Sequence, residues 1–149
     1  MSKKIQSQIQ IKAAPKLIWS VLTDFKNYPE WNPFIISLIG KVEPGNTILV
    51  RIQPPKSKPM TFKPTILSRI ENKELSWLGK FMIPGVFDGL HKFELIPNPD
   101  GTTTFVHLEE FSGILSNLLN LNKTEEGFKL MNQKLKERVE SLNRIEANS

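Results

Sequence analysis

Hydrophobic and polar residues alternate along the first segment of the chain. Ile5, Ile9 and Ile11 share one parity with Ser7, whereas lysines and glutamines occupy the positions between them. A period of two predicts a half-buried strand with one face in water. Pro15 then predicts the start of a helix, because proline suits the first helical position. The apolar stripe of that helix consists of Leu17, Ile18, Val21 and Leu22, widened by Trp19.

The middle of the chain predicts several short strands. Pro29 and Pro33 limit the aromatic segment 25–33 to a turn or a short helix, because proline cannot continue a helix. Runs rich in β-branched and aromatic residues follow, separated by glycine, proline and asparagine. We predict strands over about 34–40, 47–53, 60–70 and 74–81.

Segment 85–113 predicts a hairpin whose turn is Pro97-Asn98-Pro99-Asp100-Gly101. One parity carries His91, Phe93 and Leu95 on the first strand, and Phe105, His107, Glu109 and Phe111 on the second. The length of the turn decides which of these residues face the core. A five-residue loop sets His91 opposite His107, whereas a four-residue loop sets it opposite Leu108 and turns His107 and Glu109 outward. We predict the five-residue loop.

The last element is a long amphipathic helix. Thr124, followed by Glu125 and Glu126, predicts its start, and a short apolar turn at 114–121 precedes it. Apolar residues recur at steps of three and four: Phe128, Met131, Leu135, Val139, Leu142 and Ile145. Such a helix needs an apolar surface to cover. The pattern predicts one α+β domain over residues 1–149, in which seven strands (order β-α-α-β6-α) form a curved antiparallel sheet around this helix and enclose a cavity.

Composition excludes several classes of function. The chain has 149 residues and no cysteine, which rules out disulfides and thiolate chemistry. Its start alternates in polarity, unlike a signal peptide, and no apolar run is long enough to span a bilayer. We therefore expect a cytoplasmic, soluble protein with no integral membrane association. The net charge of +5 is matched by the excess of basic residues between Arg51 and Lys73, which we interpret as solvated side chains and not as a nucleic-acid surface.

Titratable side chains among large apolar ones suit the wall of a small-molecule cavity, where apolar area gives affinity and sparse polar groups fix orientation. Packing in the core is the alternative for each of these aromatic residues, and a satisfied buried histidine is the alternative for His91 and His107. The predicted cavity residues are Trp77, Phe81, His91, Phe93, Leu95, Phe105, His107, Phe128, Met131 and Leu135.

His91, His107 and Glu109 are the candidate catalytic groups. A neutral histidine paired with a carboxyl group can serve as base and acid in an aldol cyclisation or a dehydration. The same three side chains have the donor types of a facial metal site. Neither histidine belongs to a closely spaced ligand motif, so we predict no metal and no other cofactor. Nucleotide-binding and serine-hydrolase motifs are absent from the sequence.

Several segments resemble one superfamily. They are Ala14-Pro15 with Trp19, LTDFKNYPEWNPF at 22–34, ELSWLG at 74–79, GLHKFEL at 89–95, EEFSG at 109–113 and GFKLMNQKLKERVE at 127–140. Together they resemble the START-like, or SRPBCC, superfamily with its Bet v 1-like helix-grip fold, and within it the bacterial polyketide cyclase/dehydrase-type branch.

This resemblance implies a ligand cavity between the sheet and the long helix, but the fold does not select one activity. Members bind lipids, sterols, polyketides or plant hormones, some catalyse cyclisation, and some act on protein partners. The leading prediction is a carrier or sensor of a hydrophobic small molecule. The alternatives are a cyclase or dehydratase that uses His/Glu acid-base groups, and a protein-interaction module of the Hsp90-activator-like type. The sequence leaves a monomer and a weak dimer equally open.

Overall fold

A computed structural model describes residues 2–81, 87–113 and 121–148 of the chain. The elements follow the order strand, helices, strands, helix that the sequence predicts. Their bounds are β1 Ser2–Ile11, α1 Pro15–Leu22, η1 Phe25–Asn27, α2 Tyr28–Trp31, β2 Ile35–Ile39, β3 Leu49–Ile52, β4 Met60–Phe62, β5 Thr65–Ile70, β6 Glu74–Phe81, β7 Phe87–Pro97, β8 Thr103–Ser112 and α3 Asn122–Ala147.

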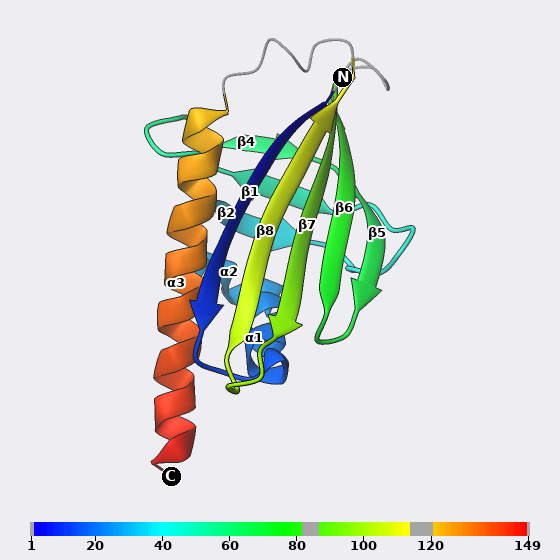
Figure 1. Ribbon diagram of the computed structural model, residues 1–149. Helices are drawn as coiled ribbons and strands as arrows, with labels where there is room; N and C mark the ends of the chain where they lie inside the picture. Colours follow the sequence, from blue (N-terminus) through cyan, green and yellow to red (C-terminus); the bar gives the residue numbers. More distant parts are fainter. Residues whose placement is uncertain (1, 82–86, 114–120, 149) are drawn as a thin grey trace.

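The strands form antiparallel sheets against which α3 packs (Figure 1). One sheet has the order β1-β8-β7-β6-β5, and β2, β3 and β4 form the other. In Figure 1, α3 runs alongside β1, and α1 and α2 lie near the end of the sheet where β7 turns into β8. The α+β helix-grip architecture is therefore confirmed.

The strand count differs from the prediction of seven strands in one sheet. The segment 60–70 forms two strands, β4 and β5, which belong to different sheets. The break includes Pro64, which has no N–H for a ladder and uses its carbonyl to accept from the N–H of Ile48 at 3.0 Å. An isolated bridge pairs Thr65, at the start of β5, with Thr47 in the segment before β3.

The β7–β8 hairpin has a five-residue loop, as predicted, but the loop is residues 98–102, one position later than expected. Pro97 still pairs with Thr103, and the Asn98 N–H closes the loop on the carbonyl of Thr102 at 2.8 Å. The predicted pairing of His91 with His107 is therefore wrong. His91 lies opposite Glu109. The parity is unchanged, because the shift moves the pairing by two positions.

Helix α3 begins at Asn122, two residues before the predicted start, and its buried face is shorter than the predicted stripe. Leu142 and Ile145 are exposed, because the last turns of α3 extend beyond the ends of the strands (Figure 1). The apolar turn predicted at 114–121 lies outside the described residues except for Leu121, which packs against the core. No helix in the described ranges is both long and apolar enough to cross a membrane.

Gly127 lets α3 approach the start of β2. A Cβ atom built at this position would lie 2.4 Å from Cδ1 of Phe34, which is far inside van der Waals contact. The ring of Phe34 in turn packs edge-to-face on Phe128, with 5.3 Å between ring centroids. The missing side chain at position 127 thus sets the distance between the helix and this aromatic group.

We expect Gly127→Ala to destabilise the protein. Glycine-to-alanine changes in exposed helices usually stabilise by up to about 1 kcal/mol. Here the overpacking against Phe34 should dominate and lower the free energy of unfolding by about 1 to 3 kcal/mol, measured by denaturant titration. The matched control is Lys129→Ala, at an exposed position of the same helix. A combined Phe34→Leu change should recover part of the loss, and a stabilising Gly127→Ala would contradict this account of the packing.

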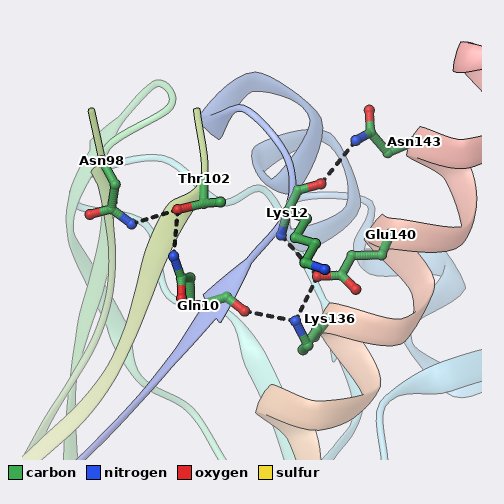
Figure 2. A network of polar contacts seen from close by, with 7 residues as sticks. All are labelled: Gln10, Lys12, Asn98, Thr102, Lys136, Glu140 and Asn143. Atoms are coloured by element: carbon green, nitrogen blue, oxygen red, sulfur yellow. Dashed lines mark hydrogen bonds and ion pairs between the residues drawn. The ribbon is translucent and has the colours of Figure 1, made fainter. Parts of the chain in front are cut away.

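A polar cluster fastens the C-terminal half of α3 to the end of β1 (Figure 2). We call Gln10, Lys12, Lys136, Glu140 and Asn143 the helix clamp. Glu140 Oε2 accepts from the backbone N–H of Lys12 at 2.8 Å and from Lys136 Nζ at 2.6 Å. Lys136 Nζ also donates to the Gln10 carbonyl at 2.9 Å, and Asn143 Nδ2 donates to the Lys12 carbonyl at 2.9 Å.

The clamp satisfies the backbone where β1 ends and prevents the helix from sliding along the strand. Burial raises the pKa of Glu140, but the hydrogen bonds from Lys136 and the Lys12 N–H outweigh it and leave that pKa below its usual value. A carboxyl group with a lowered folded pKa stabilises the protein at neutral pH, and this contribution is lost as the pH falls through the folded pKa.

We expect Glu140→Gln to lower the free energy of unfolding at pH 7 by about 1 to 2 kcal/mol, because it weakens two charge-assisted hydrogen bonds. The loss should shrink in acid, where the wild-type carboxyl group is itself protonated. Glu137→Gln serves as the control, because Glu137 forms an exposed ion pair with Lys134 at 3.3 Å. It should cost no more than about 0.5 kcal/mol. Equal losses for the two variants would show that the clamp contributes nothing beyond surface charge.

Candidate ligand site on the inner face of the sheet

The functional side chains lie in two adjacent cross-strand rows on the face of the sheet that packs against α3. The first row contains Trp77 on β6, His91 on β7 and Glu109 on β8, which are direct neighbours in the register. The second row places Phe93 on β7 beside His107 on β8. It continues at its two ends into Leu75 and Ser7.

A continuous chain of hydrogen bonds links the two rows to α3. His91 Nδ1 lies 3.2 Å from Glu109 Oε1, and His91 Nε2 lies 3.0 Å from His107 Nε2. His107 Nδ1 lies 3.0 Å from Oδ1 of Asn132, whose Nδ2 donates to Ser7 Oγ at 2.9 Å. Because buried polar groups are costly unless they are paired, this chain lets two histidines occupy the interior.

Burial increases along the chain from Glu109 to His107. The exposed fraction is 9% for Glu109, 3% for His91 and 0% for His107. Burial, and then the neighbouring His91, lowers the pKa of His107 well below the usual value, although the hydrogen bond with Asn132 raises it. His107 is therefore neutral, and Glu109 and Ser7, at the two ends of the chain, are its members closest to solvent.

Aromatic rings hold both imidazoles in place. Trp77 stacks on His91 with ring centroids 4.7 Å apart and planes 9° apart. Phe128 of α3 stacks on His107 with 3.8 Å between centroids. Phe93 contacts both imidazoles at 4.8 Å. These contacts fix the plane of each imidazole, and the hydrogen bonds then select which nitrogen faces which partner.

The structure brings the predicted cavity residues together, but as a packed cluster. Trp77, Phe93, Leu95 and Phe105 are buried, and so are the three predicted residues of α3, Phe128, Met131 and Leu135. The side chain of Phe81, which ends β6, lies outside the described part of the chain. Among the hollows lined by described residues, one of about 290 Å³ at the β5–β6 turn borders Leu95. The cavity between sheet and helix thus stays a prediction.

The candidate metal ligands form a line and do not converge. Glu109 contacts Nδ1 of His91, whereas His107 faces the opposite nitrogen, Nε2. A metal held between the two Nε2 atoms would therefore lack Glu109 as a third ligand in this arrangement. Within the described ranges, no group of three or more histidine, aspartate or glutamate side chains is placed to hold a metal ion.

Sequence reasoning missed Asn132 and Ser7 as members of the site. Both carried a signal. Asn132 is one helical turn after Phe128 and three residues before Leu135, so it interrupts the apolar stripe of the helix. Ser7 has the inward parity of Ile5 and Ile9. A polar residue on a buried face needs a partner, and Asn132 bonds to both Ser7 and His107.

One buried donor of the site has no acceptor. The indole Nε1 of Trp77 is buried and has no hydrogen-bond partner among the described residues. Trp77 is 1% exposed and stacks on His91, so this N–H belongs to the same row as the His91–Glu109 pair. An unpaired buried donor costs free energy, so this N–H has the capacity to bond to an acceptor from outside the chain.

Solved structures of the same class share this architecture. A START superfamily protein from Mycobacterium smegmatis superposes with a TM-score of 0.70 at 18% identity, covering 93% of this chain and 98% of that one. Norcoclaurine synthase from Thalictrum flavum gives 0.70 at 14% identity, with 96% and 97% covered. The Zhui aromatase/cyclase from Streptomyces sp. R1128 gives 0.67 at 13% identity, with 94% of each chain covered. The fold is therefore that of the START-like, helix-grip class.

The family follows from the sequence match. Residues 2–144 match the family model described as polyketide cyclase / dehydrase and lipid transport. The chain belongs to this family, as its motifs suggested. No curated protein matches it.

The buried His107 should make stability depend on pH. A histidine whose folded pKa is lowered stays neutral in the folded protein, whereas the unfolded chain binds a proton below about pH 6.5. The free energy of unfolding is then complete above that pH and falls as the pH is lowered below it, by up to about 1.4 kcal/mol per pH unit. His107→Gln should reduce this slope between pH 7 and about pH 5, measured by denaturant titration. Identical slopes in wild type and variant would contradict the buried, neutral state.

Proposed function

We propose that this protein binds a hydrophobic small molecule at the Glu109 end of the inner face of the sheet, as a carrier or sensor. The observation that supports this proposal most directly is the His91–Glu109 pair, set in an apolar wall with Glu109 as its least buried member. Apolar area supplies the affinity for such a ligand, and a few polar groups fix its orientation. The family match agrees with this class of ligand.

The hydrogen-bond chain divides its members into contact and support. Both ring nitrogens of His107 are already bonded, to Asn132 and to His91, and its ring lies under Phe128. His107 therefore supports the site and does not contact the ligand. The groups with free capacity are Glu109, whose hydrogen bond with His91 uses one carboxyl oxygen, and the Trp77 indole N–H. We assign the polar contact to these two residues.

Acid-base catalysis is the second candidate function. Glu109 and His91 form a donor-acceptor pair at 3.2 Å with His107 behind it, an arrangement that suits proton transfer next to a carbonyl group. Two of the solved structures of this fold carry enzyme names, a synthase and an aromatase/cyclase. In an enzyme, Glu109→Gln would abolish turnover and leave ligand affinity nearly unchanged; in a carrier, the variant would affect affinity alone.

The binding proposal is tested with 6-propionyl-2-(dimethylamino)naphthalene, an uncharged fluorescent probe. We expect saturable one-to-one binding in the micromolar range, about −8 kcal/mol, from a fluorescence titration. Glu109→Phe should weaken binding at least tenfold, because the new ring fills the proposed contact point. Native mass spectrometry of freshly purified protein should also reveal a co-purifying apolar ligand.

The matched control is Glu110→Phe, at the next position of β8, which faces away from the site and is exposed. It should bind the probe as wild type does, and cooperative thermal unfolding of both variants should establish that they are folded. Equal probe binding by the two variants would place the pocket elsewhere, and no binding by wild type would refute the function.

A further inference from the structure

The amide group of Asn132 gives the buried hydrogen-bond chain a direction. Its Nδ2 donates to Ser7 Oγ at 2.9 Å, so its oxygen faces His107 Nδ1 at 3.0 Å. An amide oxygen can only accept a hydrogen bond. His107 therefore carries its hydrogen on Nδ1. A neutral imidazole has one N–H, so Nε2 of His107 is a bare acceptor.

This direction passes through His91 to Glu109. The two Nε2 atoms of His91 and His107 lie 3.0 Å apart and share one hydrogen, which must then belong to His91. The contact of His91 Nδ1 with Glu109 Oε1 at 3.2 Å needs a hydrogen of its own. It comes either from a protonated Glu109 or from a doubly protonated His91. In both cases one proton lies between His91 Nδ1 and Glu109 Oε1, in addition to the hydrogen on His91 Nε2, and the pair has no net charge.

The opposite direction is disfavoured by burial. If the Asn132 amide were turned over, its NH₂ group would donate to His107, and each hydrogen along the chain would move to the other nitrogen. Glu109 would then be a carboxylate beside two neutral histidines. The site would carry a net charge of −1, because His91, the ion-pair partner of Glu109 among the described residues, would be neutral. Glu109 is 9% exposed, so an uncompensated charge there costs less than a fully buried one, but it disfavours this direction as long as Asn132 can accept from His107.

We infer that Asn132 is the positioning residue that keeps one proton between His91 and Glu109. The site consequently takes an uncharged apolar ligand with an oxygen acceptor, such as a ketone or ester carbonyl. The unpaired Trp77 indole N–H, in the same row, is the donor that such an oxygen satisfies. A neutral pair does not attract a cation, so an amine is the wrong partner. The ligand class rests on the proposed function, whereas the proton assignment does not.

The proton assignment is tested by ¹⁵N–¹H NMR of the imidazole groups. The chain contains two histidines, so the signals of two rings account for the whole spectrum. We expect His107 to be protonated on Nδ1 and not on Nε2, and His91 to be protonated on Nε2. Protonation of His107 on Nε2 in the wild-type protein would overturn the inference, whatever the ligand experiments show.

Variants of Asn132 separate a positioning role from a structural one. Asn132→Asp retains an acceptor and should leave His107 protonated on Nδ1. Asn132→Leu removes the acceptor, so His107 should change to the Nε2–H form. The control is Asn143→Leu on the same helix, which removes the hydrogen bond to the Lys12 carbonyl and should leave both rings unchanged. If Asn132→Leu does not fold, the wild-type and Asn132→Asp spectra still decide the assignment.

The ligand class is tested with three matched probes: 6-propionyl-2-(dimethylamino)naphthalene and its analogues with a propyl or a 1-aminopropyl group at position 6. Wild type should bind the ketone at least tenfold more tightly than either analogue, and Trp77→Phe should remove most of the preference over the propyl analogue. In Asn132→Leu the affinity for the amine should rise relative to that for the ketone, because Glu109 is then ionised.

Equal binding of ketone and amine by wild type would overturn the ligand class. Binding of none of the probes, with the expected tautomers, would refute the proposed function and leave the proton assignment standing.

Discussion

The hydrogen bond between Asn132 and His107 is the interaction on which the interior of this protein depends. It joins α3 to the middle of β8 at 3.0 Å, where both side chains are almost completely buried. Without it, an imidazole and an amide would each lose a partner in an apolar environment, at a cost of about 1 to 3 kcal/mol per group. The same bond orients His107, and through it His91 and Glu109. Packing and chemistry are therefore connected at one contact.

Helix α3 is held at two places by different physical means. Its C-terminal half is fastened to β1 by the charged and amide groups of the helix clamp (Figure 2). Its N-terminal half is held by shape, with Gly127 seated against Phe34 and Phe128 stacked on His107. The polar attachment fixes the position of the helix along the strand. The aromatic attachment sets its distance from the site, so the geometry of the imidazoles follows from the packing of the helix.

The description of the family covers both cyclases or dehydrases and lipid transport, and the solved structures with this fold include an aromatase/cyclase. The interior of this protein contains a buried polar chain from Ser7 to Glu109. A simple apolar binder gains nothing from two histidines in its core, because each must be fully paired to be tolerated. We attribute their presence to the need for a polar group of defined protonation at the Glu109 end of the site.

Much of this architecture could be predicted from the sequence alone. The alternation around Ile5, the proline at position 15 and the stripe from Phe128 to Val139 predicted a strand and two helices correctly, because each pattern reflects local burial. The inward parity of His91, His107 and Glu109 was predicted correctly as well. Their pairing was not, because a one-residue displacement of the loop changes every partner and leaves the parity intact.

The sequence by itself determined most of the elements, the family and the apolar character of the inner face, since these depend on periodicity and local motifs. Only the tertiary structure decided which polar groups meet. Ser7 and Asn132 are 125 positions apart in the chain, and Asn132 and His107 are 25 apart. No local pattern encodes such contacts, because they arise when a helix and two strands are packed at specific distances. The direction of the hydrogen bonds, and with it the proton held by His91 and Glu109, follows from that packing.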